Sequence, residues 1–320
     1  MTVLETVALE EIQKARRELA GAVVRTPLVR LNWETPGNEV FLKLENLQPI
    51  GSFKLRGAAF AMARAGSKAL AKGVYTASAG NMAQGVAWNA SRLGIPSTSV
   101  VPDHAPQTKL QSIRRLGGQI VKVPFDEWWQ VILTHRYSGL DGLFIHPVCD
   151  PAVMAGNGTI GLEILEDLPE VDAIIIPYGG GGLSCGIASA VRRLKPQVRI
   201  YACEVETAAP LFASLAAGQP RSIDYIPSFV DGIGGKSVLE EMWPLVLELI
   251  QGSIVVSLRQ TACAVRLLME RNRVVSEGAG AASVAAALSG GAGEGKIVCV
   301  VSGGNIDSDK LVKILEGEIP

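Results

Sequence analysis

The feature that most restricts the fold of this 320-residue chain is an alternation of short apolar segments with longer helical patterns. Residues 74–78, 97–101 and 119–123 are short and contain β-branched side chains. The stretches between them, residues 82–93 and 107–116, have helical periodicity. Strands that alternate with helices predict βαβ units and a mostly parallel sheet covered by helices. The fold class is therefore predicted to be α/β.

The alternation resumes beyond residue 151, so two domains are predicted, each with its own mostly parallel sheet. Residues 1–50 and 151–320 are assigned to the larger domain, and residues 51–150 to a smaller, mobile domain. Helices are expected at residues 57–65 and 158–167.

Composition and charge exclude several classes of protein. A net charge of −1 gives no electrostatic footprint for nucleic acid or an anionic membrane. No apolar run approaches the ~20 residues of a transmembrane helix, and the N-terminal stretch lacks the apolar core of a signal peptide. The five cysteines show no CxxC spacing, which indicates reduced thiols in a cytoplasmic protein. The three histidines show no metal-ligand spacing.

Lys54 lies among small and apolar residues in the segment PIGSFKLRGA at residues 49–58. Desolvation disfavours an ammonium ion and lowers its pKa. A neutral lysine amine is a nucleophile that can form a Schiff base with a carbonyl. Most lysines near glycines are solvated surface residues, so a special role for Lys54 depends on what the rest of the chain supplies.

Four consecutive glycines, residues 179–182, follow a predicted strand and precede a predicted helix. Such a run is costly in backbone entropy, but it can direct several N–H groups at an anion, and the helix dipole adds to the attraction. The position at the carboxyl end of a strand is typical of a phosphate site. The Walker A and GxGxxG patterns do not match, and a flexible turn is the alternative interpretation.

Two more turns of the same kind follow predicted strands. The segment SAGNMAQ at residues 78–84 offers a hydroxyl, an amide and backbone N–H groups for a carboxylate or a phenolic oxygen, or it is an ordinary helix cap. Ser302 in the segment SGGN is a neutral hydrogen-bonding group, or simply a turn serine. Together with Lys54, these turns suit a ligand with a phosphate, a carbonyl and a polar ring atom, and pyridoxal phosphate has all three.

The segments GSFKLRGA, SAGNMAQG, GGGGL and SGGN, in this order along about 300 residues, resemble the fold-type II pyridoxal-phosphate enzymes with the tryptophan synthase β-like fold. The resemblance is strongest to their serine/threonine dehydratase and serine racemase branch. It implies that the larger domain binds the cofactor and that the smaller domain lies on the substrate side. It further implies a cytoplasmic homodimer that acts in amino acid catabolism on a small amino acid.

The resemblance also assigns roles to residues of this chain. Lys54 is implied to be the catalytic residue that forms a Schiff base with the cofactor. The residues implied to bind the cofactor are Lys54, Phe53, Asn81, Gly179, Gly180, Gly181, Gly182, Leu183, Gly232, Glu277 and Ser302. Those implied to bind the substrate are Ser78, Ala79, Gly80, Asn81 and Met82. A neutral Ser302 beside the ring nitrogen leaves the ring a weaker electron sink, which favours elimination.

The implied reaction is β-elimination of a serine- or threonine-type hydroxy amino acid to a 2-oxo acid and ammonia. A serine racemase, a β-replacement synthase and a non-catalytic binding protein on the same fold are the alternatives. Ala79 stands where the family has the serine that serves racemases as an acid/base, which argues against racemisation. The TSGNTG-type loop of the synthases is absent, and the retained Lys54 argues against a purely binding role.

Two departures from the family pattern bear on substrate and metal. Ala79 and Met82 replace a serine and a histidine, so the substrate side is less polar. This suggests a bulkier substrate such as a β-aryl serine, hence a phenylserine dehydratase-like member, with neutral drift as the alternative.

Glu204 and Ala208 match a divalent-cation site of the branch, but Pro210 stands at the position of the second carboxylate of that site. Glu206 could substitute there, and a cation is doubtful.

Overall fold

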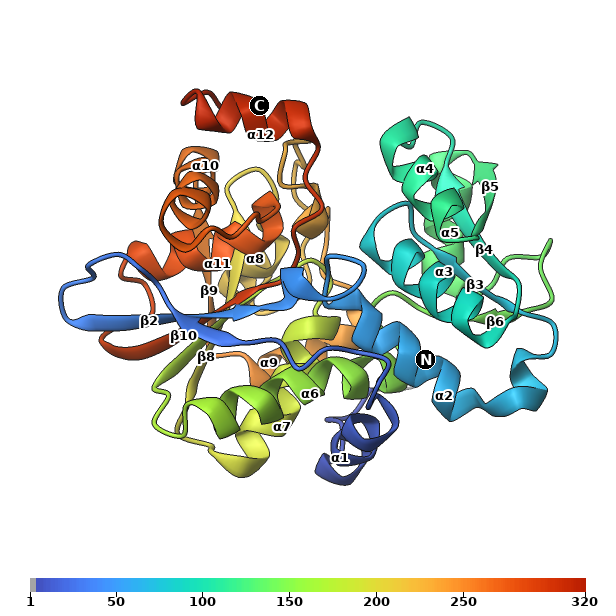
Figure 1. Ribbon diagram of the computed structural model, residues 1–320, viewed down its shortest axis with the longest axis horizontal. Coiled ribbons are helices and arrows are strands. Elements are labelled where there is room, and N and C mark those ends of the chain that lie inside the picture. Colours follow the sequence, from blue (N-terminus) through green and yellow to red (C-terminus); the bar gives the residue numbers. More distant parts are fainter. Residues whose placement is uncertain (1–3) are drawn as a thin grey trace.

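The computed structural model describes residues 4–320, which form two sheets side by side, each covered by helices (Figure 1). In spatial order, the strands of the larger sheet are β1 (Leu28–Arg30), β2 (Asn38–Leu44), β10 (Gly295–Val301), β7 (Ala173–Pro177), β8 (Arg199–Val205) and β9 (Gly252–Val256). Those of the smaller sheet are β5 (Gln119–Val123), β4 (Ser97–Pro102), β3 (Val74–Ala77) and β6 (Leu143–Phe144). Among these strands of the described residues, only β1 and β2 pair antiparallel, and the other pairs are parallel. The predicted α/β class is confirmed.

The α-helices are α1 (Leu9–Glu18), α2 (Lys54–Leu70), α3 (Asn81–Leu93), α4 (Gln107–Arg115), α5 (Phe125–Thr134), α6 (Pro151–Asp167), α7 (Gly182–Leu194), α8 (Pro210–Ala217), α9 (Trp243–Leu249), α10 (Leu258–Leu267), α11 (Gly278–Leu288) and α12 (Ser308–Leu315). The 3₁₀ turns are η1 (Glu45–Leu47), η2 (Asp231–Ile233) and η3 (Glu240–Met242), and a π-helical turn, η4 (Leu268–Asn272), follows α10. Within residues 4–320, no helix has both the length and the apolar character needed to cross a membrane.

Alternating side chains of the larger sheet bury its two faces against different helices. Ile175 and Cys299 lie in one core with the small residues of α11, and α10 adds to this layer. Their neighbours Ile174 and Val298 point to the opposite face and pack with α6, α7 and α9. Both faces are therefore covered, which is why these strands read as continuous apolar runs.

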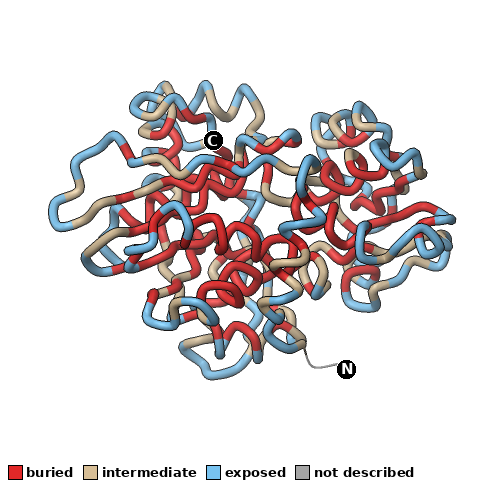
Figure 2. Tube along the Cα trace, turned by 60° about the horizontal axis from the view of Figure 1, so that its bottom comes forward, coloured by how far each residue is buried: buried red, intermediate tan, exposed pale blue. Residues whose placement is uncertain are grey.

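The smaller sheet has the same layered construction. Val74 of β3 packs with α2 and α3, whereas Tyr75 lies in the core on the α5 side. Buried residues run through both halves of the molecule, with exposed loops around them (Figure 2). The domain boundaries stay a prediction, and residues 1–3 of the predicted larger domain lie outside the described residues.

Two helices begin earlier than the sequence predicts. Helix α2 starts at Lys54 itself, and α6 starts at Pro151, where Asp150 accepts a hydrogen bond from the N–H of Ala152. The predicted helix at residues 158–167 lies within α6, and its predicted start was wrong because glycines in the first turns of α6 lower the local helix propensity. In the fold they permit close packing: a Cβ at Gly156 would lie 2.5 Å from the carbonyl oxygen of Arg56.

A cluster of four buried charges fixes the start of α2. The Arg56 guanidinium donates to Glu45 at 2.8 Å and to Glu163 at 2.7 Å. The Lys43 ammonium lies 2.6 Å from Glu163 and donates to the Thr26 carbonyl at 2.6 Å. All four charged side chains are at most 6% exposed, and their formal charges cancel. The cluster joins β2, η1, α2 and α6 two residues beyond Lys54.

The Arg56→Ala change is expected to lower the free energy of unfolding by about 3–5 kcal/mol, because it leaves the buried Glu45 carboxylate without its cation and leaves Glu163 paired with Lys43 alone. The matched control is Arg64→Ala on the same helix, which removes an exposed ion pair with Glu11 and should cost less than about 1 kcal/mol. The measurement is the urea midpoint of each variant. Equal shifts for the two variants would contradict a structural role for the cluster.

Candidate active site

A cavity of about 520 Å³ lies between the two sheets. Its walls are the loops at the carboxyl ends of β3, β7 and β10 together with the start of α2. All the residues predicted to bind cofactor or substrate line it: Phe53, Lys54, Ser78, Ala79, Gly80, Asn81, Met82, Gly179, Gly180, Gly181, Gly182, Leu183, Gly232, Glu277 and Ser302. Six stretches of the chain, distant from one another in sequence, thus converge on one space.

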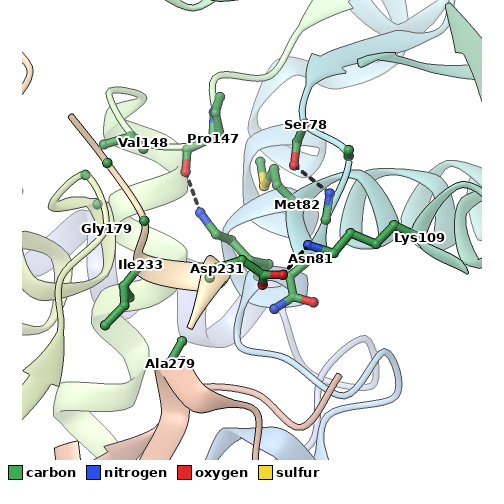
Figure 3. Close-up of a pocket in the computed structure, with 18 of the residues that line it drawn as sticks. Ser78, Asn81, Met82, Lys109, Pro147, Val148, Gly179, Asp231, Ile233 and Ala279 are labelled. Atoms are coloured by element: carbon green, nitrogen blue, oxygen red, sulfur yellow. Dashed lines mark hydrogen bonds and ion pairs between the residues drawn. The ribbon is translucent and has the colours of Figure 1, made fainter. Parts of the chain in front are cut away.

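Lys54 is the first residue of α2, and its Nζ donates a 2.7 Å hydrogen bond to the carbonyl oxygen of Pro147 (Figure 3). The side chain is half-buried at the cavity, and desolvation lowers the pKa of Lys54 to about 8. About a tenth of the amine is therefore neutral at pH 7, far more than for an ordinary lysine, and this neutral form is a nucleophile and a base.

The turn that presents the Pro147 carbonyl is shaped by His146. Its Nδ1 accepts hydrogen bonds from the N–H groups of Val148 at 3.0 Å and Cys149 at 2.6 Å, and its Nε2 lies 3.2 Å from the Ile132 carbonyl oxygen. Burial lowers the pKa of His146 to about 3, so the ring is neutral. With Nδ1 accepting, Nε2 carries the proton and donates to Ile132.

The same ring belongs to a group of metal-type ligands that the sequence spacing did not reveal. His135 and Glu241 lie beside His146, and the Nε2 of His135 is 3.1 Å from Glu241. Because both ring nitrogens of His146 are engaged with backbone groups, this arrangement leaves that ring no lone pair for an ion.

The glycine loop, residues 179–182, connects β7 to α7. Within residues 4–320, no acceptor is present for the backbone N–H groups of residues 179–183. Gly181 has φ +101°, and a Cβ at Gly180 would lie 2.8 Å from the Val148 side chain. Only glycine fits this backbone, and the result is a row of free donors at the positive end of a 13-residue helix. Such a row is suited to a phosphate.

Ser302 and Phe53 are adjacent in the cavity. The Phe53 N–H donates to the Ser302 carbonyl at 3.0 Å, and the Lys54 Nζ lies 5.2 Å from the centre of the Phe53 ring. Ser302 is 3% exposed and lines the cavity. A buried hydroxyl that lines a cavity is free to bond with a ring nitrogen of a bound group.

Asn81 is held by two side chains. Its Nδ2 donates to Glu277 at 2.9 Å, and its Oδ1 accepts from the Nδ2 of Asn305 at 2.8 Å. The Asn305 Nδ2 also donates to the Ile50 carbonyl at 2.9 Å, which fixes the orientation of the Asn305 amide because a carbonyl can only accept. The chain of bonds therefore directs the Asn81 oxygen toward Asn305 and its NH₂ group toward Glu277. Burial raises the pKa of Glu277 to about 7.

The sequence did not single out Asn305 as a site residue, although it lies in the quoted SGGN segment. Its partner Asn81 is 224 residues away, so no local pattern marks the contact. The same holds for Lys109 and Asp231, which lie 122 residues apart and form a 2.8 Å ion pair at the cavity (Figure 3).

The N-terminus of α3 forms the wall opposite the glycine loop segment. Ser78 accepts a hydrogen bond from the Gly80 N–H at 3.2 Å, and Gly80 rather than Ser78 or Asn81 is the N-cap residue. The alternative of an ordinary side-chain cap is therefore wrong. The amides of residues 81–83 have no acceptor among residues 4–320, so they can bind an anion such as a carboxylate.

The residues considered for a metal are used otherwise. Both oxygens of Glu204 accept hydrogen bonds, from the N–H groups of Leu211 and Phe212 at 2.8 Å, and Ser253 adds a third bond. Glu206 accepts from the N–H of Leu258. Both carboxylates thus accept hydrogen bonds from N–H groups at the N-termini of helices, α8 for Glu204 and α10 for Glu206. Neither they nor Ala208 belong to a group of metal-type ligands in the described residues.

Comparisons with known proteins agree with this geometry. The family model described as pyridoxal-phosphate dependent enzyme matches residues 19–303. The chain is 40% identical to an L-threonine ammonia-lyase of Thermotoga maritima, over 97% of this chain and 78% of that protein. It is 36% identical to the catabolic L-threonine dehydratase of Escherichia coli K12, over 96% of each. The solved structure of maize serine racemase superposes with a TM-score of 0.86 at 32% identity, over 98% of each chain.

The Asn305→Asp change is expected to weaken binding of pyridoxal phosphate about tenfold, because a carboxylate cannot donate to Asn81 or Ile50 and the Asn81 amide loses its orientation. Dissociation constants come from absorbance titration of cofactor-free protein. The control is Asn32→Asp, whose amide donates to the Arg271 carbonyl outside the cavity. Wild-type affinity in Asn305→Asp would show that Asn81 needs no such support.

Proposed function

Because the chain belongs to the pyridoxal-phosphate dependent enzyme family, we propose that this cavity binds pyridoxal phosphate and that Lys54 is its catalytic residue. The enzyme is an ammonia-lyase that carries out β-elimination of a β-hydroxy-α-amino acid. The observation that carries the site assignment is the convergence of a low-pKa amine, a row of free N–H donors and the Ser302 hydroxyl on one cavity.

The residues present fit this cofactor. The free N–H groups of residues 179–183 would hold the phosphate, the Ser302 hydroxyl would pair with the ring nitrogen, and the Asn81 amide would donate to the phenolic oxygen. Phe53 packs beside the ring, and Gly232 and Glu277 complete the wall. When bound, pyridoxal phosphate supplies a carbonyl that reacts with amines and a conjugated ring that accepts an electron pair from the substrate.

Lys54 moves the proton. Its neutral Nζ takes the α-proton of the substrate, and the pKa of about 8 suits a base that works near neutral pH. The Pro147 carbonyl holds the amine at the cavity while it is uncharged and reactive. The β-hydroxyl leaves with a proton as water, and uptake of water at the former α-carbon releases ammonia. Threonine would give 2-oxobutanoate and ammonia.

The N-terminus of α3 orients the substrate. Its free amides and the Ser78 hydroxyl bind the carboxylate, which directs the α-proton toward Lys54. The positive end of the helix dipole favours this anion. Gly80, the N-cap residue, lets the carboxylate approach the backbone closely, since no Cβ projects from it.

A second candidate, serine racemase, is favoured by the structural similarity to the maize enzyme. Racemisation needs a proton donor on the face opposite Lys54, and Ala79 offers only a methyl group at the predicted position. Elimination needs no second acid/base there. We therefore place racemisation, β-replacement and a purely binding role below elimination.

We further propose that the enzyme works in the cytoplasm, in amino acid catabolism, as a homodimer. The five cysteines are unpaired, which is typical of reducing compartments. The homodimer rests on the resemblance alone, and the molar mass in solution, expected at twice 33.8 kDa, tests it.

The first experiment is the visible absorption spectrum of the purified protein with pyridoxal phosphate. We expect a yellow band that Lys54→Ala abolishes and that the surface change Lys313→Ala leaves intact. Addition of β-hydroxy amino acids should perturb the band and release a 2-oxo acid. A wild-type protein that stays colourless after reconstitution would overturn the proposed function.

A further inference from the structure

One face of α5 forms an aromatic wall of the cavity. Phe125, Trp128, Trp129 and Ile132 all line it, and their spacing of three, four and seven residues places them on one side of the helix. The Phe125 and Trp128 rings lie 5.5 Å apart, and the Trp128 and Trp129 rings 6.1 Å apart. We call these four residues the α5 face.

The α5 face starts beside the reacting amine. The Ile132 carbonyl accepts the hydrogen bond from His146, and the next residue, Pro147, accepts the bond from the Lys54 Nζ. From Ile132 the face runs back to Phe125, seven residues or about 10 Å along the helix. Phe125 is 39% exposed, so the wall extends from the neighbourhood of Lys54 toward solvent.

Apart from the indole N–H groups of Trp128 and Trp129, the polar groups of the cavity lie on other elements. In the proposed function, the glycine loop and Ser302 bind the cofactor, and the α3 N-terminus binds the carboxylate that every amino acid substrate has. The acidic residues of α5, Asp126 and Glu127, do not line the cavity in the described structure. Met82, 1% exposed, and Leu239 extend the apolar surface. A small substrate would leave this surface in contact with water, which is unfavourable.

We propose that the α5 face selects β-hydroxy-α-amino acids with a large apolar β-substituent, an aryl group above all, over threonine. This inference rests on the proposed function and names its substrate class. A threonine methyl group is too short to contact the wall beyond Ile132, whereas a β-phenyl ring can lie against Trp129. The attraction between aromatic rings adds to the burial of the apolar ring surface, so discrimination of about tenfold is expected.

The first test compares kcat/KM for threo-phenylserine and threonine. We expect wild type to prefer phenylserine at least tenfold, and Trp129→Ala to reduce this ratio about tenfold. Trp129→Phe, which keeps a ring, should retain most of it. The control is Trp88→Ala, which removes an indole outside the cavity and should leave the ratio unchanged.

The second test measures binding without turnover. L-Phenylalanine and L-2-aminobutyrate lack the leaving hydroxyl, so calorimetry on the cofactor-loaded protein gives their affinities directly. Phenylalanine should bind about tenfold tighter, and Trp129→Ala should remove the difference. Equal binding of the two ligands, or no binding of either, would overturn the inference.

The outcomes separate the two proposals. Efficient turnover of threonine together with rejection of phenylserine would defeat the substrate inference and leave the lyase intact. Alternatively, phenylalanine could bind more tightly to wild type but not to Trp129→Ala, while no substrate yields a 2-oxo acid. That result would support selection by the α5 face and defeat the proposed reaction.

Discussion

The buried ion cluster around Arg56 is the interaction on which the position of Lys54 depends. Two cations and two carboxylates are withdrawn from water in one place, and each is tolerated only because the others are present. The cluster ties the first turn of α2 to β2, η1 and α6. Since Lys54 is the first residue of α2 and α6 begins just after the turn that carries Pro147, one cluster sets both the amine and its carbonyl partner.

The parallel topology supplies the rest of the geometry. Parallel strands of one sheet end at a common edge, so the loops after β7 and β10 meet although they are more than a hundred residues apart in sequence, and the loop after β3 of the smaller sheet lines the same cavity. Two polar links then join the halves of the molecule across the cavity: Asn81 with Glu277 and Asn305, and Lys109 with Asp231. These links hold the α3 side of the cavity against the larger sheet and close the space between the sheets.

The sequence predicted those parts whose signal is local. The alternation of strands and helices predicted the two sheets, and the glycine loop and the Lys54 segment were recognisable because few other backbones need such residues. Asn305, His146 and the Lys109–Asp231 pair were missed, since their partners become neighbours only in the folded chain. The start of α6 was missed for a related reason: Gly156 lowers helix propensity locally, and its benefit, close contact with α2, is tertiary.

The residues proposed for the reaction and those proposed to select the substrate lie on different elements around the cavity. The groups that bind the cofactor and the substrate carboxylate lie on loops at the ends of strands, where the sheets hold them rigidly. Lys54 lies beside them at the start of α2, and burial lowers its pKa to about 8. The α5 face reaches the cavity from the other side of the smaller sheet, and its polar side-chain atoms are the indole nitrogens of Trp128 and Trp129 alone. Its side chains can therefore change in size without disturbing a hydrogen bond to Lys54, the glycine loop or Asn81. Such a division lets one reaction be kept while the accepted β-substituent varies with the residues on a single helix face.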